Sequence, residues 1–207
     1  HRVDREVWLK AGETGLLLLD VPAEYGGGGG DFRHEAVLYE ELARRGLTGF
    51  GQGVHSIAAH YVLNHGDEAQ KRRWLPRLAR GELIGAITRA VRDGDHYVVN
   101  GSKIFITNGG SATLLMLVVR TDPADRKRGL SILMVETEGL AGYRVGRVLD
   151  KMGMHAQDTA ELFFEDVRVP VDCLLGPEEG RGMYQLMADL PYERAIIALC
   201  GVGAMEG

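Results

Sequence analysis

Two neighbouring charged residues near the end of the chain, Glu193 and Arg194, are the first candidates for chemistry. They stand at the start of an apolar helix that we predict from the spacing of Ile196, Ile197 and Leu199. A carboxylate in an apolar pocket can serve as a general base, because burial raises its pKa towards the operating pH. Charged side chains are mostly exposed, so the local sequence by itself favours a surface pair.

Two further segments carry side chains suited to binding. One is Phe105-Ile106-Thr107, whose local pattern is that of strand residues and a neighbour. The other is Lys151-Met152-Gly153-Met154, which locally predicts a tight connection with two packing methionines. Neither local pattern establishes a function.

Three other patterns do not indicate binding sites. The five glycines at 26–30 lack the Lys-Ser/Thr ending of a phosphate loop and follow no strand, so we expect a mobile turn. Gly201-Val202-Gly203 lies in a helical pattern without the third glycine of a dinucleotide fingerprint, and it predicts close helix packing. His55, His60 and His65 recur every five residues, which scatters them around a helix, so we expect no metal site.

The composition sets the class of protein. With 207 residues, 45% of them hydrophobic, the chain can build one large domain or two small ones. A net charge of −5 gives no electrostatic support for binding nucleic acid or anionic membranes.

The longest apolar run, at 16–19, is far shorter than the ~20 residues that span a bilayer. Cys173 and Cys200 are too few for a disulfide framework, and no charged-then-apolar leader opens the sequence, so we expect a soluble, reduced protein of the cytoplasm (of the mitochondrial matrix in a eukaryote).

The first third of the sequence predicts helices. Aspartates suited to N-caps precede several apolar-periodic segments, and Asp67-Glu68-Ala69-Gln70 resembles a capping box. Pro76 should shorten or kink the last of these helices. Trp8 and Trp74 are expected in the core. The predicted helices start near Asp4, Asp31, Gly51 and Asp67 and end near Gly12 or Gly15, Arg45, Asn64 and Pro76.

After Gly81 the apolar period becomes that of strands. Asn100-Gly101 between two apolar segments predicts a two-residue hairpin, because this pair fits the positive φ angles of a type I′ turn. Helical spacing returns from Gly180 onward. Further short strands are predicted at 83–87, 114–119, 131–135 and 162–164.

Taken as a whole, the sequence resembles the flavin-dependent acyl-CoA dehydrogenase family. The resemblance extends in order over nearly the whole chain, and its pieces are weak alone but highly specific together. The matching pieces include Trp8-Leu9-Lys10-Ala11-Gly12, Tyr25-Gly26-Gly27, Glu40-Glu41-Leu42-Ala43, Gly101-Ser102-Lys103, Ile106-Thr107-Asn108-Gly109, Lys151-Met152-Gly153-Met154 and Asp158-Thr159-Ala160-Glu161-Leu162.

The resemblance implies an α+β fold in three parts. These are an N-terminal helical domain (1–86), a middle antiparallel β-barrel-like domain (87–178) and the first helix of a C-terminal helical bundle (179–207). It further implies FAD as cofactor, an acyl-CoA substrate, an electron-transfer flavoprotein as electron acceptor, and a homo-oligomer, either tetramer or dimer.

By the same resemblance, Phe105, Ile106 and Thr107 lie against the flavin ring. An aromatic residue at the Phe105 position shields the ring, and the Thr107 hydroxyl bonds near its reactive nitrogen. Many family members carry Trp where this chain has Phe105, so the indole N–H donor is lost here.

Glu193 is then the base that removes the proton from the carbon alpha to the thioester, while a hydride leaves the beta carbon for the flavin. Arg194 and Tyr192 are the implied substrate-binding residues. Most branches of the family supply the base from the C-terminal bundle, whereas the long-chain and isovaleryl branches place it at the Glu193 position. Short sequence segments such as Asn64-His65-Gly66 resemble the long-chain branch most, and the isovaleryl branch second.

A medium- or long-chain substrate is expected on side-chain volume. Gly51, Gly53, Ala58 and Ala59 could leave room between helices for a deep acyl channel.

One family feature is missing from the sequence. Family members carry a Thr-Glu-Pro…Gly-Ser-Asp loop after the strand at 83–87, but Ile87-Thr88 here continues directly into Arg89. Either the loop is deleted or it was left out of the printed sequence, and the usual mobility of ligand-ordered loops favours the second. A same-fold enzyme that uses oxygen, and a degenerate acyl-CoA-binding homologue without catalysis, remain as alternatives.

Overall fold

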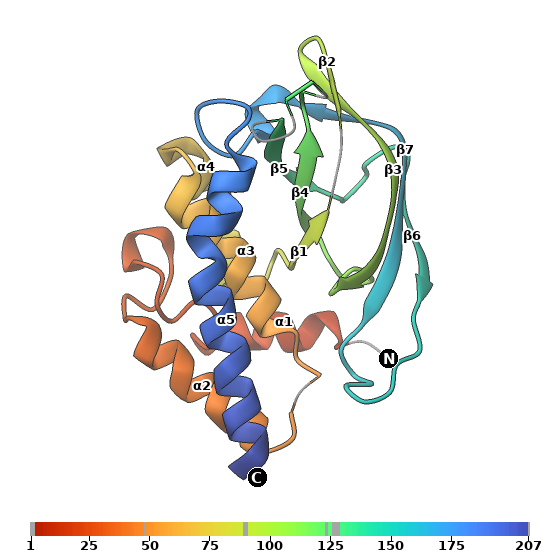
Figure 1. Ribbon diagram of the computed structural model, residues 1–207. Helices are drawn as coiled ribbons and strands as arrows, with labels where there is room; N and C mark the ends of the chain where they lie inside the picture. Colours follow the sequence, from red (N-terminus) through yellow and green to blue (C-terminus); the bar gives the residue numbers. More distant parts are fainter. Residues whose placement is uncertain (1–2, 48, 89–90, 123, 126–128, 207) are drawn as a thin grey trace.

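The computed structural model describes residues 3–47, 49–88, 91–122, 124–125 and 129–206. Helices come first in the chain, a β unit follows, and one long helix completes it. The helices lie together on one side of the molecule and the strands on the other, and α5 extends along the helical side (Figure 1). This arrangement confirms the predicted α+β class.

The N-terminal helices begin where the sequence predicts. Two of the three predicted aspartate caps are capping boxes: Asp31 accepts from the Arg33 amide at 3.0 Å, and Asp67 accepts from the Gln70 amide at 2.8 Å. Asp4 precedes the first helix without a side-chain cap bond. Pro76 does not end its helix, which continues to Ala79. The helices are α1 (Arg5–Glu13), α2 (Phe32–Arg44), α3 (Gln52–His65) and α4 (Glu68–Ala79).

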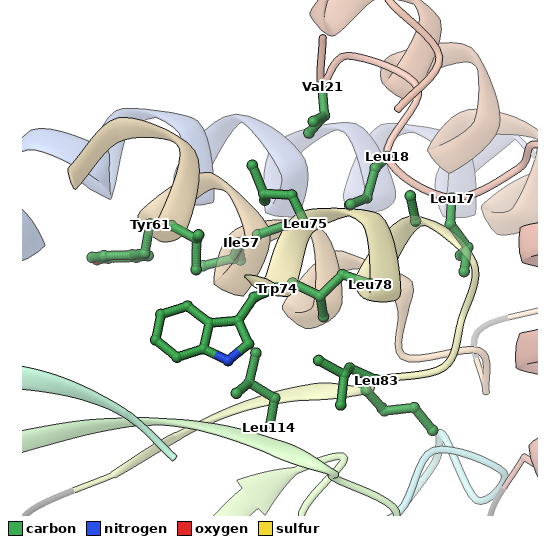
Figure 2. Close-up of a cluster of buried hydrophobic side chains, with 14 of the residues drawn as sticks. Leu17, Leu18, Val21, Ile57, Tyr61, Trp74, Leu75, Leu78, Leu83 and Leu114 are labelled. Atoms are coloured by element: carbon green, nitrogen blue, oxygen red, sulfur yellow. The ribbon is translucent and has the colours of Figure 1, made fainter. Parts of the chain in front are cut away.

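The helical part is built around one apolar core. Trp8 and Trp74 are both fully buried, as predicted. In Figure 2, Trp74 and Leu78 of α4 lie close to Leu114, the first residue of a β-strand. The core therefore continues from the helices into the first sheet and holds the two parts together.

Two sheets form the β unit. One has the order β1-β4-β5 and the other β2-β3-β7-β6. The pairing of β1 with β4 is parallel, which departs from the predicted all-antiparallel unit, and the other pairs are antiparallel. A second apolar core fills the space between them. The strands are β1 (Gly85–Thr88), β2 (Val91–Asp93), β3 (His96–Thr107), β4 (Leu114–Arg120), β5 (Leu130–Glu136), β6 (Tyr143–Val148) and β7 (Thr159–Pro170).

The hairpin predicted at Asn100-Gly101 is wrong. Both of its predicted arms belong to the single strand β3, which pairs with β7 over nearly its full length. At this point the register shifts, and the Asn100 side chain bonds the backbone amide and the carboxylate of Asp166, each at 2.8 Å. The residue pair therefore forms a β-bulge, and the chain reverses instead at Gly94, between β2 and β3.

The last helix, α5 (Gly182–Glu206), lies in the segment where helical spacing is predicted from Gly180 onward. It passes through Pro191, so Glu193 lies in the middle of the helix and not at its start. Gly203 packs against α2, where a Cβ atom would stand 2.9 Å from that of Ala43, and this confirms the close helix packing predicted there. Among the described residues, no helix is long and apolar enough to cross a bilayer.

Glu136 at the end of β5 joins the helical part to the β unit. Its carboxylate accepts from the Trp74 indole at 3.0 Å, from Arg73 at 3.1 Å and from Arg77 at 2.8 Å. Burial disfavours the charged form of Glu136, but the bonds from Arg77 and Trp74 outweigh it and lower the pKa of this carboxyl below its ordinary value.

We predict that Glu136→Gln lowers the free energy of unfolding by about 1–2 kcal/mol at neutral pH, because it weakens the charge-assisted bonds from Arg73, Arg77 and the buried Trp74. A depressed carboxyl pKa stabilises the fold above the unfolded-state value and loses that contribution as the pH falls through the folded-state value. The difference between variant and parent should thus shrink in acid, as measured by urea unfolding from pH 7 to pH 3. Glu138→Gln, at an exposed carboxylate nearby, is the control. A difference that stays constant with pH would contradict the account.

Candidate active site

The end of β3 presents apolar side chains outward. Phe105 has a φ of +64° and is 71% exposed, and the register of β3 on β7 shifts between Lys103 and Ile106. The shift breaks the alternation of the strand, so Ile104 and Phe105 are both exposed while Ile106 packs towards the β core. A positive φ at an aromatic residue is strained backbone of the kind that collects at ligand sites.

Thr107 ends this strand opposite Thr159 of β7. Its side chain is half-buried, and within the described part of the chain its hydroxyl has no hydrogen-bond partner. A hydroxyl at this position is free to bond a ligand that lies against Phe105.

Asn108 fixes the position of Thr107. It is buried, has a φ of +60°, and its side-chain amide donates to the Gly51 carbonyl at 2.8 Å. Gly51 is the N-cap of α3, and a Cβ atom there would overlap the Asn108 amide. The contact therefore joins the end of β3 to the beginning of α3. The sequence analysis missed Asn108 as a functional residue, although it stands in the Ile106-Thr107-Asn108-Gly109 piece.

Asp158 holds the turn after Asn108. It is 3% exposed and accepts from the Gly110 amide at 2.6 Å and the Ser111 hydroxyl at 2.7 Å, while its carbonyl accepts from the Asn108 amide at 3.0 Å. It is a second missed residue, and its only signal was its place in the Asp158-Thr159 piece of the family pattern.

The connection at 151–157 is closed by Lys151. Its ammonium donates to the Gln157 carbonyl at 2.7 Å and to the Thr159 hydroxyl at 2.9 Å. Met152 is fully exposed and Met154 half-exposed with a φ of +47°, so the prediction of two packing methionines is wrong. The loop instead adds exposed apolar surface.

Glu193 faces α3. Its carboxylate accepts from the hydroxyl of Tyr61, a fully buried residue, at 2.8 Å. The side chain of Glu193 is neither fully buried nor open to solvent, so it is not the surface residue that the local sequence favoured. Within the described residues no hydrogen bond joins Glu193 to the segment 105–107. The two are linked through α3, because Gly53 near its start packs against Ile196 of α5.

Tyr192 and Arg194 point to different surroundings. The Tyr192 hydroxyl donates to Asp20 at 3.1 Å and its ring stacks on His60 at 4.0 Å, so its polar atom is used inside the helical part. Burial and the acidic groups nearby raise the pKa of Tyr192. Arg194 is exposed and, in the described part of the chain, has no ion-pair partner.

Glu35, a buried carboxyl, is a further candidate for the role of base. Glu35 of α2 is fully buried, and burial together with the nearby Asp20 raises its pKa to about 7. Both of its oxygens accept hydrogen bonds, from the Leu19 amide at 2.9 Å and from Gln52 at 3.0 Å. Because Glu35 lies inside the core with both oxygens engaged, no substrate can reach it without unpacking α2.

The three histidines of α3 have separate partners. His55 bonds the Leu78 carbonyl at 3.1 Å, His60 bonds Asp20 at 3.0 Å, and His65 bonds Asp189 at 2.7 Å. Among the described residues no cluster of three or more His, Cys, Asp or Glu side chains could hold a metal ion.

The small residues of α3 serve packing. The space beside Gly51 is filled by Asn108, and Ala58 lies where a Cβ on Gly85 would come within 2.6 Å of it. Ala58 and Ala59 are fully buried. The expectation that Gly51 and Ala58 open an acyl channel is therefore wrong, and Gly53 remains the small residue beside α5.

A hollow of about 720 Å³ lies beside the first turns of α5. Arg181, Met183, Tyr184 and Met187 line it from the helix side. Seven residues separate Met187 from Arg194, so both lie on the same face of α5. The hollow and the free guanidinium thus share one side of the helix.

The sequence and the fold of this chain are similar to those of known proteins. The model of the acyl-CoA dehydrogenase N-terminal domain matches residues 1–82, and that of the acyl-CoA dehydrogenase middle domain matches residues 82–167. The chain belongs to the acyl-CoA dehydrogenase family. The crystal structure of an acyl-CoA dehydrogenase from Geobacillus kaustophilus is 43% identical and superposes with a TM-score of 0.93, over 99% of this chain and 58% of that one.

Among curated relatives, a long-chain specific acyl-CoA dehydrogenase of Mus musculus is 44% identical over 222 residues, which covers 99% of this chain and 51% of the relative. An isovaleryl-CoA dehydrogenase of Pongo abelii is 36% identical over 98% of the chain and 52% of the relative. The chain thus spans about half the length of the relatives it matches. The 222-residue match exceeds the 207 residues of this chain, so some positions of the mouse protein have no counterpart here.

We predict that Gly51→Ala destabilises the fold by about 1–3 kcal/mol, because the new methyl group displaces the Asn108 amide from a well-packed site. The matched control is Gly201→Ala, which places a methyl group in open space on a helix and should be neutral or stabilising by about 0.5–1 kcal/mol. Urea unfolding of both variants measures the difference. Equal stability of the two would show that the Gly51–Asn108 approach is unimportant.

Proposed function

We propose that the protein containing this chain catalyses the FAD-dependent α,β-dehydrogenation of an acyl-CoA thioester to the trans-2-enoyl-CoA. The observation that carries this proposal is Glu193, a half-buried carboxylate held on α5 by the Tyr61 hydroxyl. Family membership and the position of this carboxylate together support it as the base.

Glu193 takes the proton from the carbon alpha to the thioester. The carboxylate oxygen that Tyr61 does not hold receives the proton, and the Cα–H bond breaks as the O–H bond forms.

The residues at the end of β3 fit a flavin. An exposed aromatic side chain at Phe105 and exposed Ile104 offer an apolar wall for a planar ring, and the Thr107 hydroxyl is free to donate to a ring nitrogen. Ile106 supports the wall from the β core. When bound there, FAD supplies the acceptor for the hydride that leaves the beta carbon.

The CoA part of the substrate would follow the outer face of α5. Arg194 would supply a positive charge for an anionic group of CoA, since it is exposed and has no ion-pair partner in the described part of the chain. Tyr192 would contribute to substrate binding indirectly, because its contacts with Asp20 and His60 hold α5 in place.

The higher identity to the long-chain relative (44%) than to a short-chain specific one of Clostridium acetobutylicum (40%) or to the isovaleryl one (36%) supports a medium- or long-chain acyl group. The resemblance supports an electron-transfer flavoprotein as acceptor and a homotetramer or homodimer as the assembly.

We predict that Glu193→Gln keeps its flavin but loses at least about 10²-fold in kcat/KM, because the amide cannot accept the alpha proton. Anaerobic bleaching of the flavin absorbance by an acyl-CoA measures the loss. Glu138→Gln, with its exposed carboxylate, should bleach at the parent rate. Undiminished bleaching of Glu193→Gln places the base elsewhere, and a purified parent without bound flavin supports the non-catalytic homologue.

Substrate length is tested with saturated acyl-CoAs from C4 to C16. We expect kcat/KM to rise towards the longer chains, because added methylenes gain binding energy in an apolar site, about 0.8 kcal/mol for each one buried. The measurement is anaerobic bleaching or reduction of a dye acceptor. A preference for short branched acyl groups would contradict the assignment to the long-chain branch.

A further inference from the structure

The seam between α3 and α5 carries two polar contacts, one helical turn apart. Tyr61 of α3 donates to Glu193 of α5 at 2.8 Å. One turn away, Asp189 of α5 accepts from Asn64 at 2.6 Å and bonds His65 at 2.7 Å. Residues four apart share a helix face, so both contacts lie along one line between the helices.

Asp189 sets the register of α5 on α3. Its carboxylate is 5% exposed, and burial of a charged group without partners is costly, so the bonds to Asn64 and His65 disfavour sliding of the helix. With that contact fixed, Glu193 stands where the Tyr61 hydroxyl reaches it.

The Tyr61 hydroxyl is suited to be a permanent donor. Burial, followed by the hydrogen bond to Glu193, raises the pKa of Tyr61 well above its ordinary value, so the phenol keeps its proton. A buried tyrosine hydroxyl needs a partner, and Glu193 is the one that this hydroxyl has.

We propose that Tyr61 is a positioning residue for the base: its hydroxyl holds one carboxylate oxygen of Glu193 so that the other is aimed at the substrate's alpha carbon. This inference rests on the proposed function. Tyr61 does not itself accept or release a proton in the reaction. It limits the rotamers of Glu193, so that the other carboxylate oxygen stays directed at the substrate.

Several other charged or titratable groups lie near this contact. From α3 and α5 these are His65 and Asp189, which pair with each other. Behind Tyr192 lie Asp20 and His60, also paired. Glu35 and Tyr39 of α2 complete the surroundings. These neighbours remain when Tyr61 is changed, so a fall in kcat of a Tyr61→Phe variant reports the lost hydroxyl.

Tyr61→Phe removes the donor and keeps the ring. We expect kcat to fall about tenfold with KM nearly unchanged, since the base loses its orientation but the substrate contacts remain. Tyr143→Phe is the matched control, because it removes a buried hydroxyl from β6, away from α5. Its kcat and KM should equal those of the parent.

An unchanged kcat in Tyr61→Phe, or a loss that appears in KM alone, overturns the proposal and leaves Tyr61 a packing residue. Unfolding free energies give a readout that does not depend on activity. In a double-mutant cycle of Tyr61→Phe with Glu193→Ala, non-additive effects support the contact, and strictly additive effects refute it. If the effects are coupled but Glu193→Gln remains fully active, the proposed base fails and the positioning role fails with it.

Discussion

The close approach of Asn108 to Gly51 is the constraint on which the site depends. It ties the end of β3, with Thr107, to the first residue of α3. The same helix carries Tyr61 ten residues later, about 15 Å along its axis at the rise of an α-helix. Because α3 is packed rigidly in the core, it acts as a spacer between the ring-binding strand and the proposed base. A side chain at position 51 would disturb both ends of this arrangement.

Apolar packing alone would not align these parts. Burial of apolar surface is non-directional, so it holds α5 against α2 and α3 without selecting one register. Hydrogen bonds to buried or half-buried carboxylates do select a register, because a carboxylate withdrawn from water without a partner is costly. Asp189 with His65, Glu193 with Tyr61, and Glu136 with Trp74 are such contacts, and each joins elements far apart in the sequence. The geometry of the site thus rests on a few polar contacts within a largely apolar interior.

The chain's family resemblance and its structure contribute different things to the site. The resemblance gives roles to Glu193, Thr107 and Phe105, which lie on two elements without a direct hydrogen bond between them. The structure adds the residues that support them, above all Asn108, Asp158 and Tyr61. The sequence did not indicate these supporting residues, except where they stand in segments that resemble the family. A hydrogen bond between distant segments leaves no local periodicity in the sequence. Tyr192 shows that neighbours in sequence need not share a site. It is adjacent to Glu193 in the sequence, but its hydroxyl turns away from Glu193 towards Asp20.

The sequence by itself determined the local elements: the capping boxes at Asp31 and Asp67, the strands of the β unit, the buried tryptophans and the family. These follow from nearest-neighbour bonds and from the period of apolar residues, which short segments contain in full. It did not determine that Asn100-Gly101 forms a bulge, because β7 pairs with both sides of that dipeptide and its Asp166 bonds the asparagine. Nor did it show that Glu193 would lie in the middle of α5, turned towards Tyr61. Those outcomes were decided by tertiary structure, since they depend on partners about 65 to 130 residues away that only the folded chain brings together.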